Sequence, residues 1–510
     1  MTTIGGRVLV CGAGPTGLVT AIGLARSGVE VVVIDSAAEA SPLSRAAVVW
    51  RRTLEVLHDA VPSRRFIDEG RIVEGIHIES EGRLLRDVGF PRESVVFPPG
   101  VLIPQSTTER ILTESLSDLG IEIRRGVELR EVAADENEVE VVLGAAGATH
   151  RESFEWLIGA DGAHSRVRHA LGLEFPGESI ERRWILADLD VEDSGPEDRI
   201  RFFLGHAGMA GLFPYGDGRW RLIADGGPID LATPRRDPDR GEIEAILAER
   251  TSLDWTIKAT PWLADFRVNE RQVEAYRHGR VLLAGDAAHV HSPAGGQGMN
   301  TSIQDAVNLA WKLSMVMRGT ASDSLLDTYQ AERHPVGAAV VRGSGKALEF
   351  AMDRGPLVTF LKRRILPVAL GLDIVRGKVV RRLSEIDIHY HGGPLADDRS
   401  DRWIGRRLPD LPLAPGGPSI HEEIGTIGFT IITFGGASVE SDGLLDAAAS
   451  AAGPGVRVLA AGAGSGDVGT LQHALEIGDE GVAIIRPDTY LGPVTEDPAR
   501  VKDWFAIFRA

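Results

Sequence analysis

The stretch that decides the fold of this chain is RVLVCGAGPTGL, residues 7–18. It begins as a short apolar strand and ends in the first turn of a helix that Gly28 terminates. Between strand and helix lies the spacing Gly-x-Gly-x-x-Gly, which is typical of a dinucleotide-binding turn. A second apolar strand, residues 31–34, follows and ends in Asp35. The sequence therefore predicts a βαβ unit with parallel strands.

Each residue type in this turn has a physical role toward a dinucleotide. Gly12 permits the tight turn, Gly14 lets a pyrophosphate approach the backbone, and Gly17 lets helix and strand pack closely. The start of the helix offers unpaired N–H groups and a positive dipole end to phosphates. Asp35 is placed to bind the hydroxyl groups of a ribose. We predict a nucleotide site here, which also includes Ala13, Pro15, Thr16 and Ser36.

A second motif of the same kind lies further along the chain. The apolar residues 281–284 are followed by Gly285-Asp286-Ala287-Ala288-His289, and Pro293–Asn300 then opens another helix. A carboxylate at a strand end can accept hydrogen bonds from a polyol such as a ribityl chain. Taken alone, Asp286 could equally be a buried residue that caps a loop. Two such motifs in one chain fit one extended ligand with two ends.

Composition excludes several classes of function. The 510 residues include 55 Lys and Arg against 73 Asp and Glu, a net charge of −18, which disfavours nucleic acid or an anionic membrane as a partner. Cys11 is the single cysteine, so the chain has no disulfide and no Cys-x-x-Cys pair. No secretory signal precedes the first strand, and we expect a cytoplasmic protein.

A third motif, Ile158–Arg168, reads IGADGAHSRVR. Together with the two glycine-rich turns, it resembles the FAD-dependent aromatic hydroxylases with one dinucleotide fold, the class A flavoprotein monooxygenases. Para-hydroxybenzoate hydroxylase is their type member, and the phenol hydroxylases and aromatic polyketide hydroxylases form a branch of the family. The resemblance covers about residues 1–350. The last hundred or so residues resemble the thioredoxin-like tail of that branch, without its redox cysteines.

The resemblance, together with changes of pattern along the chain, implies an α/β protein of several domains. We expect a Rossmann-like FAD-binding domain interleaved with an antiparallel-sheet substrate domain, and a C-terminal thioredoxin-like domain. The expected boundaries are 1–174 and 272–396 for the FAD-binding domain, with 70–105 contributing to the substrate region, 175–271 for the substrate domain, 397–418 for a linker, and 419–510 for the thioredoxin-like domain.

The resemblance also implies roles for individual residues. Asp286 would bind the ribityl chain of FAD, and Asp161-Gly162 would serve both FAD and the nicotinamide cofactor. Arg45 and Gln105 match residues that contact FAD, although Arg45 taken alone would be a solvated charge. Asp35 stands where glutamate is commoner, a change we expect to be harmless. The segment that would wrap the isoalloxazine contains Pro293, Gly296, Gly298, Met299 and Asn300.

The activity implied is hydroxylation of a phenolic or polyketide-type ring by dioxygen. NADPH or NADH would reduce FAD and leave, and a flavin C4a-hydroperoxide would transfer its distal oxygen. The sequence singles out no catalytic base, so we name no catalytic residue. Phe213, Pro214 and Tyr215 are the expected substrate contacts, because this strand region lines the substrate pocket in the family. We expect a monomer or a homodimer.

Three alternatives stay open. The chain could bind FAD without redox chemistry, or it could be a flavin-dependent halogenase, although it lacks their Trp-x-Trp-x-Ile-Pro motif. A plain NAD-dependent dehydrogenase would explain the first turn but not the Asp286 motif. The pairs His289/His291 and His389/His391 suggest a metal only weakly, because no third ligand lies at a suitable spacing, and we predict no metal site.

Overall fold

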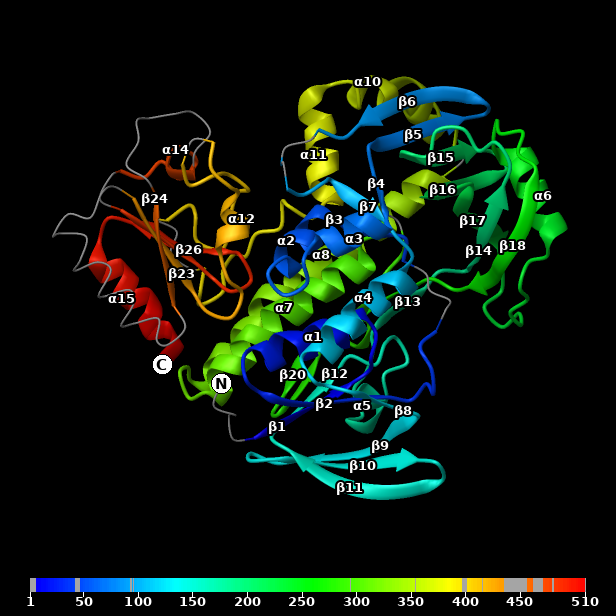
Figure 1. Ribbon diagram of the computed structural model, residues 1–510. Coiled ribbons are helices and arrows are strands. Elements are labelled where there is room, and N and C mark those ends of the chain that lie inside the picture. The colour runs from blue at the N-terminus through cyan, green and yellow to red at the C-terminus, as the bar shows by residue number, and fades with distance from the viewer. Residues whose placement is uncertain are drawn as a thin grey trace.

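The structure is a computed structural model of the chain. It describes residues 6–41, 46–91, 94, 96–293, 295–353, 355–396, 401–414, 416–434, 456–461, 471–478 and 481–509. A parallel sheet with its helices lies at the lower centre of Figure 1, a larger antiparallel sheet lies to the right, and the C-terminal sheet lies to the left. The long helices α7 (Gly298–Met317) and α8 (Asp327–Met352) run between these parts.

The central sheet has the strand order β20-β21-β12-β1-β2-β8. Its strands are parallel except for β20. They read as near-continuous apolar runs because helices cover the sheet. The bounds are β1 Arg7–Cys11, β2 Glu30–Asp35, β8 Ile123–Arg125, β12 Trp156–Gly159, β20 Arg277–His278 and β21 Val281–Leu283.

Helices α1 (Pro15–Arg26), α4 (Gln105–Asp118) and α7 pack with this sheet to form the largest apolar core. The predicted strand–turn–helix of residues 7–28 is confirmed, with Pro15 at the first helical position, where its missing N–H costs nothing. A three-stranded antiparallel sheet lies beside the central one, made of β9 (Val127–Ala134), β10 (Val139–Ala145) and β11 (Ala148–Phe154). The short helix α5 spans Arg166–Ala170.

The second large sheet has seven strands in the order β18-β14-β17-β16-β15-β5-β6. Two of its strands come from an early segment, since β5 (Gly75–Ser80) pairs in parallel with β15 and β6 (Arg83–Gly89) pairs with β5. The chain therefore crosses between the two large sheets more than once. The remaining bounds are β14 Arg182–Val191, β15 Arg199–Gly205, β16 Gly208–Gly216, β17 Arg219–Pro228, β18 Ile257–Phe266 and the covering helix α6 Arg240–Arg250.

Short elements connect the two large sheets. One small sheet is β13-β19-β22 and another is β3-β7-β4. Helix α11 (Asp373–Leu383) lies near β5 and β6 (Figure 1). The other bounds are β3 Val48–Trp50, β4 Arg71–Ile72, β7 Gly100–Leu102, β13 Gly177–Ser179, β19 Asn269–Gln272, β22 His289–Val290, α2 Arg51–Leu57, α3 Arg64–Glu69, α9 Pro356–Phe360 and α10 Leu366–Ala369.

The C-terminal part contains a four-stranded sheet with the order β24-β23-β25-β26. Strands β23 and β24 are parallel, whereas β25 is antiparallel to both of its neighbours. The bounds are β23 Thr430–Phe434, β24 Arg457–Ala461, β25 Val482–Ile485, β26 Leu491–Thr495, α12 Ile420–Glu423, α14 Leu471–Leu475 and α15 Pro498–Ala506. Across the described ranges, no helix is long and apolar enough to cross a membrane.

Candidate cofactor site

The candidate site begins at one edge of the central sheet. Strands β1, β2, β12 and β21 run in the same direction and are in register, so their carboxyl ends lie together. Asp35 is the last residue of β2, and Gly12, Asp161 and Asp286 follow within three residues of the ends of β1, β12 and β21. Ligands of open α/β sheets bind at this edge. The fold thus brings together the motifs that the sequence analysis singled out.

The backbone of the first turn requires its glycines. Gly12 has φ +105°, and a side chain there would lie 2.3 Å from the carbonyl oxygen of Ala160. A side chain at Gly17 would lie 1.9 Å from the Gly12 carbonyl oxygen. Gly14 differs, because no atom of the described residues lies within 4 Å of the place its side chain would take. The turn is therefore closed toward the sheet and open at Gly14.

Asp35 and Gln105 each bind a nearby backbone segment. The Asp35 carboxylate accepts hydrogen bonds from the N–H groups of Ala13 (2.7 Å) and Ala37 (2.8 Å). The side-chain oxygen of Gln105 accepts one from the Ala46 N–H, at 3.2 Å. A carboxylate has room for about four hydrogen bonds, so Asp35 keeps the capacity to accept from a ribose.

Asp161 lies at the end of β12 and binds the start of helix α5. Its Oδ2 accepts hydrogen bonds from the N–H groups of Arg166 (2.6 Å) and Val167 (3.1 Å). Burial raises the pKa of Asp161, and these hydrogen bonds oppose that shift only in part. A buried carboxylate beside the glycine-rich turn thus lies in the wall of the candidate site.

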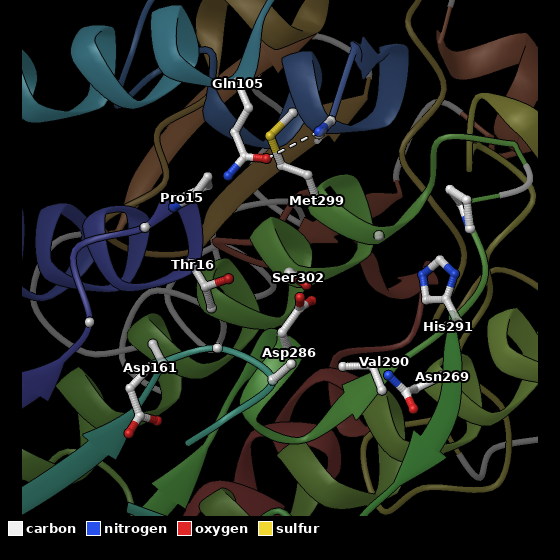
Figure 2. Close-up of a pocket in the computed structure, with 18 of the residues that line it drawn as sticks. Pro15, Thr16, Gln105, Asp161, Asn269, Asp286, Val290, His291, Met299 and Ser302 are labelled. Atoms are coloured by element: carbon white, nitrogen blue, oxygen red, sulfur yellow. Dashed lines mark hydrogen bonds between the residues drawn. The ribbon is translucent and has the colours of Figure 1, made fainter. Parts of the chain in front are cut away.

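The main cavity of the described chain runs along this edge of the sheet and has a volume of about 490 Å³. Figure 2 shows Pro15, Thr16 and Asp161 on one side, Asp286 and Ser302 in the middle, and Val290, His291 and Asn269 on the other side. The predicted site residues that line it are Gly12, Gly14, Pro15, Thr16, Asp35, Ser36, Gln105, Asp161, Gly162, Phe213, Asp286, Pro293, Gly296, Gly298 and Met299.

Other predicted residues lie elsewhere. Ala13 and Gly17 lie in the turn but are absent from the cavity wall, and Pro214 and Tyr215 continue β16 beyond it. Asn300 joins segments of backbone: its Oδ1 accepts from the Trp50 N–H at 2.8 Å, and its Nδ2 donates to two carbonyl oxygens. Arg45 lies outside the described residues.

A smaller apolar chamber adjoins the main cavity. Phe213, Ile223 and Pro293 line both spaces. The rest of its wall is aromatic or aliphatic apart from glycine, and it includes Trp50, Trp184, Phe202, Met209 and Leu348. No ionisable side chain of the described residues lines it. The chamber has a volume of about 40 Å³, which is too small for a whole ring system, so it extends the apolar wall of the main cavity and is not a separate pocket.

His291 and Ser302 line the main cavity but were not predicted as site residues. Within the described chain, neither His291 Nε2 nor Ser302 Oγ has a hydrogen-bond partner, although both atoms are buried. Buried polar atoms without partners are uncommon in native structures, so each one calls for an explanation. His291 was visible in the sequence only as half of a weak metal pair, and nothing in the sequence distinguished Ser302.

The histidine pairs take no part in a metal cluster within the described ranges, where no group of three His, Cys, Asp or Glu side chains could hold an ion. His289 instead contacts Asp305 through Nε2, at 2.7 Å, and Asp305 also accepts from Arg333. His289 is thus part of a buried ion network.

Comparison with known proteins identifies the family. The model of the FAD binding domain matches residues 6–344. The chain belongs to this family. The resemblance to FAD-dependent aromatic hydroxylases, drawn from the three motifs, is confirmed, and so is the α/β fold with a parallel and an antiparallel sheet.

The relatives are monooxygenases. The chain is 37% identical over 418 residues to 6-methylpretetramide 4-monooxygenase of Streptomyces rimosus, covering 79% of this chain and 73% of that one. It is 32% identical to a flavin-dependent monooxygenase of Mycobacteroides abscessus, covering 98% of this chain and 99% of that one.

Two solved structures are similar over almost their whole length. CabE, an aromatic hydroxylase from angucycline biosynthesis, is 29% identical with a TM-score of 0.79, and the match covers 99% of this chain and 100% of that one. PyrE3, a Diels-Alderase in pyrroindomycin biosynthesis, is 26% identical with a TM-score of 0.75, and the match covers 99% and 100%.

Proposed function

We propose that the chain is an FAD-dependent monooxygenase that uses NAD(P)H and dioxygen to hydroxylate an aromatic substrate of phenolic or polyketide type. The observation that carries this proposal is that the main cavity adjoins the apolar chamber. The main cavity passes both glycine-rich turns, and Phe213, Ile223 and Pro293 separate it from an apolar chamber. A long dinucleotide in the main cavity would end beside these three apolar residues, against which an aromatic ring could pack.

The residues of the main cavity fit FAD. Open space beside Gly14 leaves room for a pyrophosphate at the start of α1. Asp35 would bind the adenosine ribose, and the exposed Asp286 would bind the ribityl chain. Ser302, which also lines the cavity, lies close to Asp286 (Figure 2). Gln105 and the segment Pro293–Met299 would complete the site.

When bound, FAD would supply the electron transfer and the activation of dioxygen. The chain would position the flavin and the substrate, provide a positive helix end, and exclude water from the site. The start of helix α7, at Gly298, offers N–H groups and a positive dipole end that favour an anionic group beside it. The apolar residues Phe213, Ile223 and Pro293, which line the cavity, would exclude water from the substrate. We assign no general base.

NAD(P)H would act as a transient reductant near Asp161 and Gly162. The described part of 175–280 is mostly antiparallel sheet, which offers no second phosphate-binding turn between a strand and a helix. Binding should therefore be weak, with a Kd on the order of 10 μM to 1 mM. Stopped-flow reduction under anaerobic conditions should saturate only at high NAD(P)H. Submicromolar binding would contradict this part of the proposal.

We also propose the domain division expected from the sequence, with the FAD-binding domain in 1–174 and 272–396, the substrate domain in 175–271 and a linker in 397–418. The strand pairing of β5 with β15 supports a contribution of 70–105 to the substrate region. The order β24-β23-β25-β26, with only β23 and β24 parallel, supports a thioredoxin-like fold for 419–510. Cys11 is the single cysteine, so that domain would have no dithiol chemistry.

A second candidate function is a non-redox rearrangement on the same fold. The similarity to PyrE3, whose name describes a Diels-Alderase, favours it. Incubation with a panel of phenols and polycyclic quinones under ¹⁸O₂ separates the two functions. Hydroxylation predicts one labelled oxygen in the product and NAD(P)H consumption that requires dioxygen. A product that contains no labelled oxygen and forms without NAD(P)H consumption would favour the rearrangement.

A further inference from the structure

The segment 355–383 exposes a cluster of large apolar side chains. It contains the helices α9, α10 and α11, and α10 and α11 lie at the top of Figure 1, beside β6. Among the described residues, eleven large apolar side chains are exposed, and six of them belong to this segment. Their exposed fractions range from 50% to 75%, and they are Leu357, Phe360, Ile365, Val368, Leu372 and Ile374. An exposed apolar patch of this kind marks a surface that binds a partner.

The same segment is strongly basic. It has seven Lys and Arg residues and one acidic residue, Asp373, which is a local net charge of +6 in a chain of −18. Asp373 is already paired with Arg376, at 2.7 Å. Among the described residues, no carboxylate pairs with the exposed Arg363, Arg364 or Lys378. The acidic charge that disfavours an anionic membrane as a partner therefore belongs to the rest of the chain, and this segment has the opposite sign.

The inner side of the segment is held to the body of the protein. Val380 and Leu383 of α11 pack into an apolar core, and Leu383 also lines the apolar chamber beside the main cavity. Lys362 is buried and donates to the carbonyl oxygens of Ala351 and Asp353, both at 2.8 Å. The segment is thus fixed by these inner contacts, and its exposed apolar side chains point away from the protein.

Apolar and basic side chains are interleaved on the outer side. On α11, the exposed Ile374, Lys378 and Arg381 follow one another at intervals of four and three residues, so they share one face of the helix. Before α10, the exposed Arg364 directly precedes the exposed Ile365. Long basic side chains can lay their methylene groups along an apolar surface and extend the charge to a polar boundary. This combination is typical of helices that lie in the surface of a membrane.

Charge and geometry separate the partners that could cover this surface. A symmetric contact between two copies would place one patch of +6 against another, and a head-to-tail contact would not close. A single acidic protein would need carboxylates at fixed positions opposite the interleaved basic residues, whereas lipid headgroups rearrange to meet them. We propose that the segment 355–383 docks the protein on an anionic lipid surface. The apolar side chains would insert among the headgroups, and the basic side chains would bind lipid phosphates.

Docking would have a consequence for substrate supply. Because Leu383 of α11 lines the apolar chamber, the docked face lies next to the apolar end of the main cavity. An aromatic substrate of low solubility in water concentrates in a bilayer, so it would be released close to this end. This consequence rests on the proposed function, whereas the docking itself does not.

Flotation of the full chain with lipid vesicles tests the proposal. Vesicles of phosphatidylcholine alone are compared with vesicles of equal parts phosphatidylcholine and phosphatidylglycerol, at low and at high salt. The wild type should bind the anionic vesicles about tenfold more tightly than the neutral ones, or more, because several basic residues face the lipid. The bound fraction should fall as salt rises, since salt screens charges at a surface.

Two double variants separate the contributions of charge and apolar area. Arg363→Glu/Arg364→Glu should weaken binding to anionic vesicles by about tenfold or more. Val368→Ser/Ile374→Ser should weaken it by about tenfold, because apolar area no longer leaves water on docking. All four side chains are exposed, so the fold should tolerate both variants.

The matched controls make the same changes outside the segment. Arg235→Glu/Arg236→Glu changes the net charge equally at two exposed positions. Leu119→Ser/Leu231→Ser removes two exposed leucines, whose exposed fractions are 42% and 40%. Both controls should bind anionic vesicles as the wild type does, since neither changes the docking segment.

Three results would overturn the proposal: a wild type that does not float with anionic vesicles, binding that persists in either segment variant, or equal loss in the controls. Light scattering in solution identifies the rival occupant. A dimer that Val368→Ser/Ile374→Ser dissociates, in a protein that binds no vesicles, would assign the patch to a second copy of the chain. The FAD content of each variant is measured separately, and failure of the wild type to bind FAD would refute the proposed function and leave the docking result standing.

Discussion

Helix α7 connects two regions whose buried polar atoms differ. At its start, by the main cavity, His291 Nε2 and Ser302 Oγ lack partners among the described residues. Further along, Lys312 donates to Glu332 at 2.7 Å, and Arg486 donates to both oxygens of Glu332, also at 2.7 Å. The first region borders a cavity and has buried polar atoms without partners, whereas the charged groups of the second region are paired with one another.

The paired region joins the C-terminal part to the rest of the chain. Asp488 accepts hydrogen bonds from Asn308 (2.9 Å), Trp311 (3.1 Å) and Arg486 (2.7 Å), and its carbonyl accepts from Arg52 at 2.9 Å. Burial alone would raise the pKa of Glu332, but the charges of Arg486 and Lys312 outweigh it and lower the pKa to about 2. Pairing, not exposure, keeps this carboxylate ionised. The middle of α7 therefore carries paired charges, whereas the start of the helix borders the main cavity.

The largest effect, on the free energy of unfolding, is expected from a substitution in the paired region. Glu332→Gln leaves Lys312 buried without its carboxylate and Arg486 with Asp488 alone, which should lower the free energy of unfolding by about 3–5 kcal/mol. Glu244→Gln is the matched control, because it removes an i,i+4 pair with Arg240 whose side chains are each 51% exposed. It should cost at most about 0.5 kcal/mol. Thermal unfolding midpoints measure both, and equal shifts would refute the contrast.

A pH-dependent effect is expected at Glu385. Burial raises its pKa to about 8, and hydrogen bonds from Thr301 (2.7 Å) and Gln304 (2.5 Å) oppose this only in part. The folded protein therefore binds a proton that the unfolded chain releases above pH 4.5. Stability from this group is complete below pH 4.5 and decreases as pH rises to 8, by at most about 1.4 kcal/mol per pH unit.

Glu385→Gln should remove that slope, because glutamine is uncharged throughout. The measurement is the unfolding midpoint of both proteins at intervals from pH 4.5 to 8.5. The variant should gain stability relative to the wild type as pH rises. A constant difference across the range would show that Glu385 is ionised in the folded protein.

An intermediate effect, on the affinity for FAD, is expected at the main cavity. Asp286→Ala should weaken FAD binding by about 1–3 kcal/mol, because a charged hydrogen-bond acceptor is lost. Asp286→Asn should lose less, since an amide oxygen still accepts. Fluorescence titration with FAD measures the change, and Glu244→Gln should bind as the wild type does. Unchanged affinity in Asp286→Ala would remove Asp286 from the proposed site.

The smallest effect is expected at Cys11. Burial, together with the charges of Asp161 and Asp35, raises the pKa of its thiol well above the usual value. The thiol therefore stays protonated and acts as a small core side chain. Cys11→Ser should leave turnover within a few-fold of the wild type. Near-complete loss of turnover with FAD still bound would indicate thiol chemistry.

The sequence predicted the outline of the fold and fifteen of the residues that line the cavity, which is fewer than half of its wall. It did so because parallel strands of one sheet end at one edge, so acids after separate strands must converge. It could not predict that Asn300 would bind Trp50 and Val48, segments 250 residues away. Nor could it show that Pro214 and Tyr215 lie off the cavity wall, because β16 has only some of its residues there.

By itself, the sequence determined the family, the glycine-rich turn and the placement of acids after strands, since these depend on local backbone geometry and on strand periodicity. Only the tertiary structure decided which buried polar groups are paired. The contacts of Glu332 with Arg486 span 154 residues, and the hydrogen bonds of Asn300 with Trp50 and Val48 span 250 and 252 residues. Such pairing depends on atoms that are far apart in the sequence, so no local pattern predicts it. The pairing is what distinguishes a structural ion network from a ligand site.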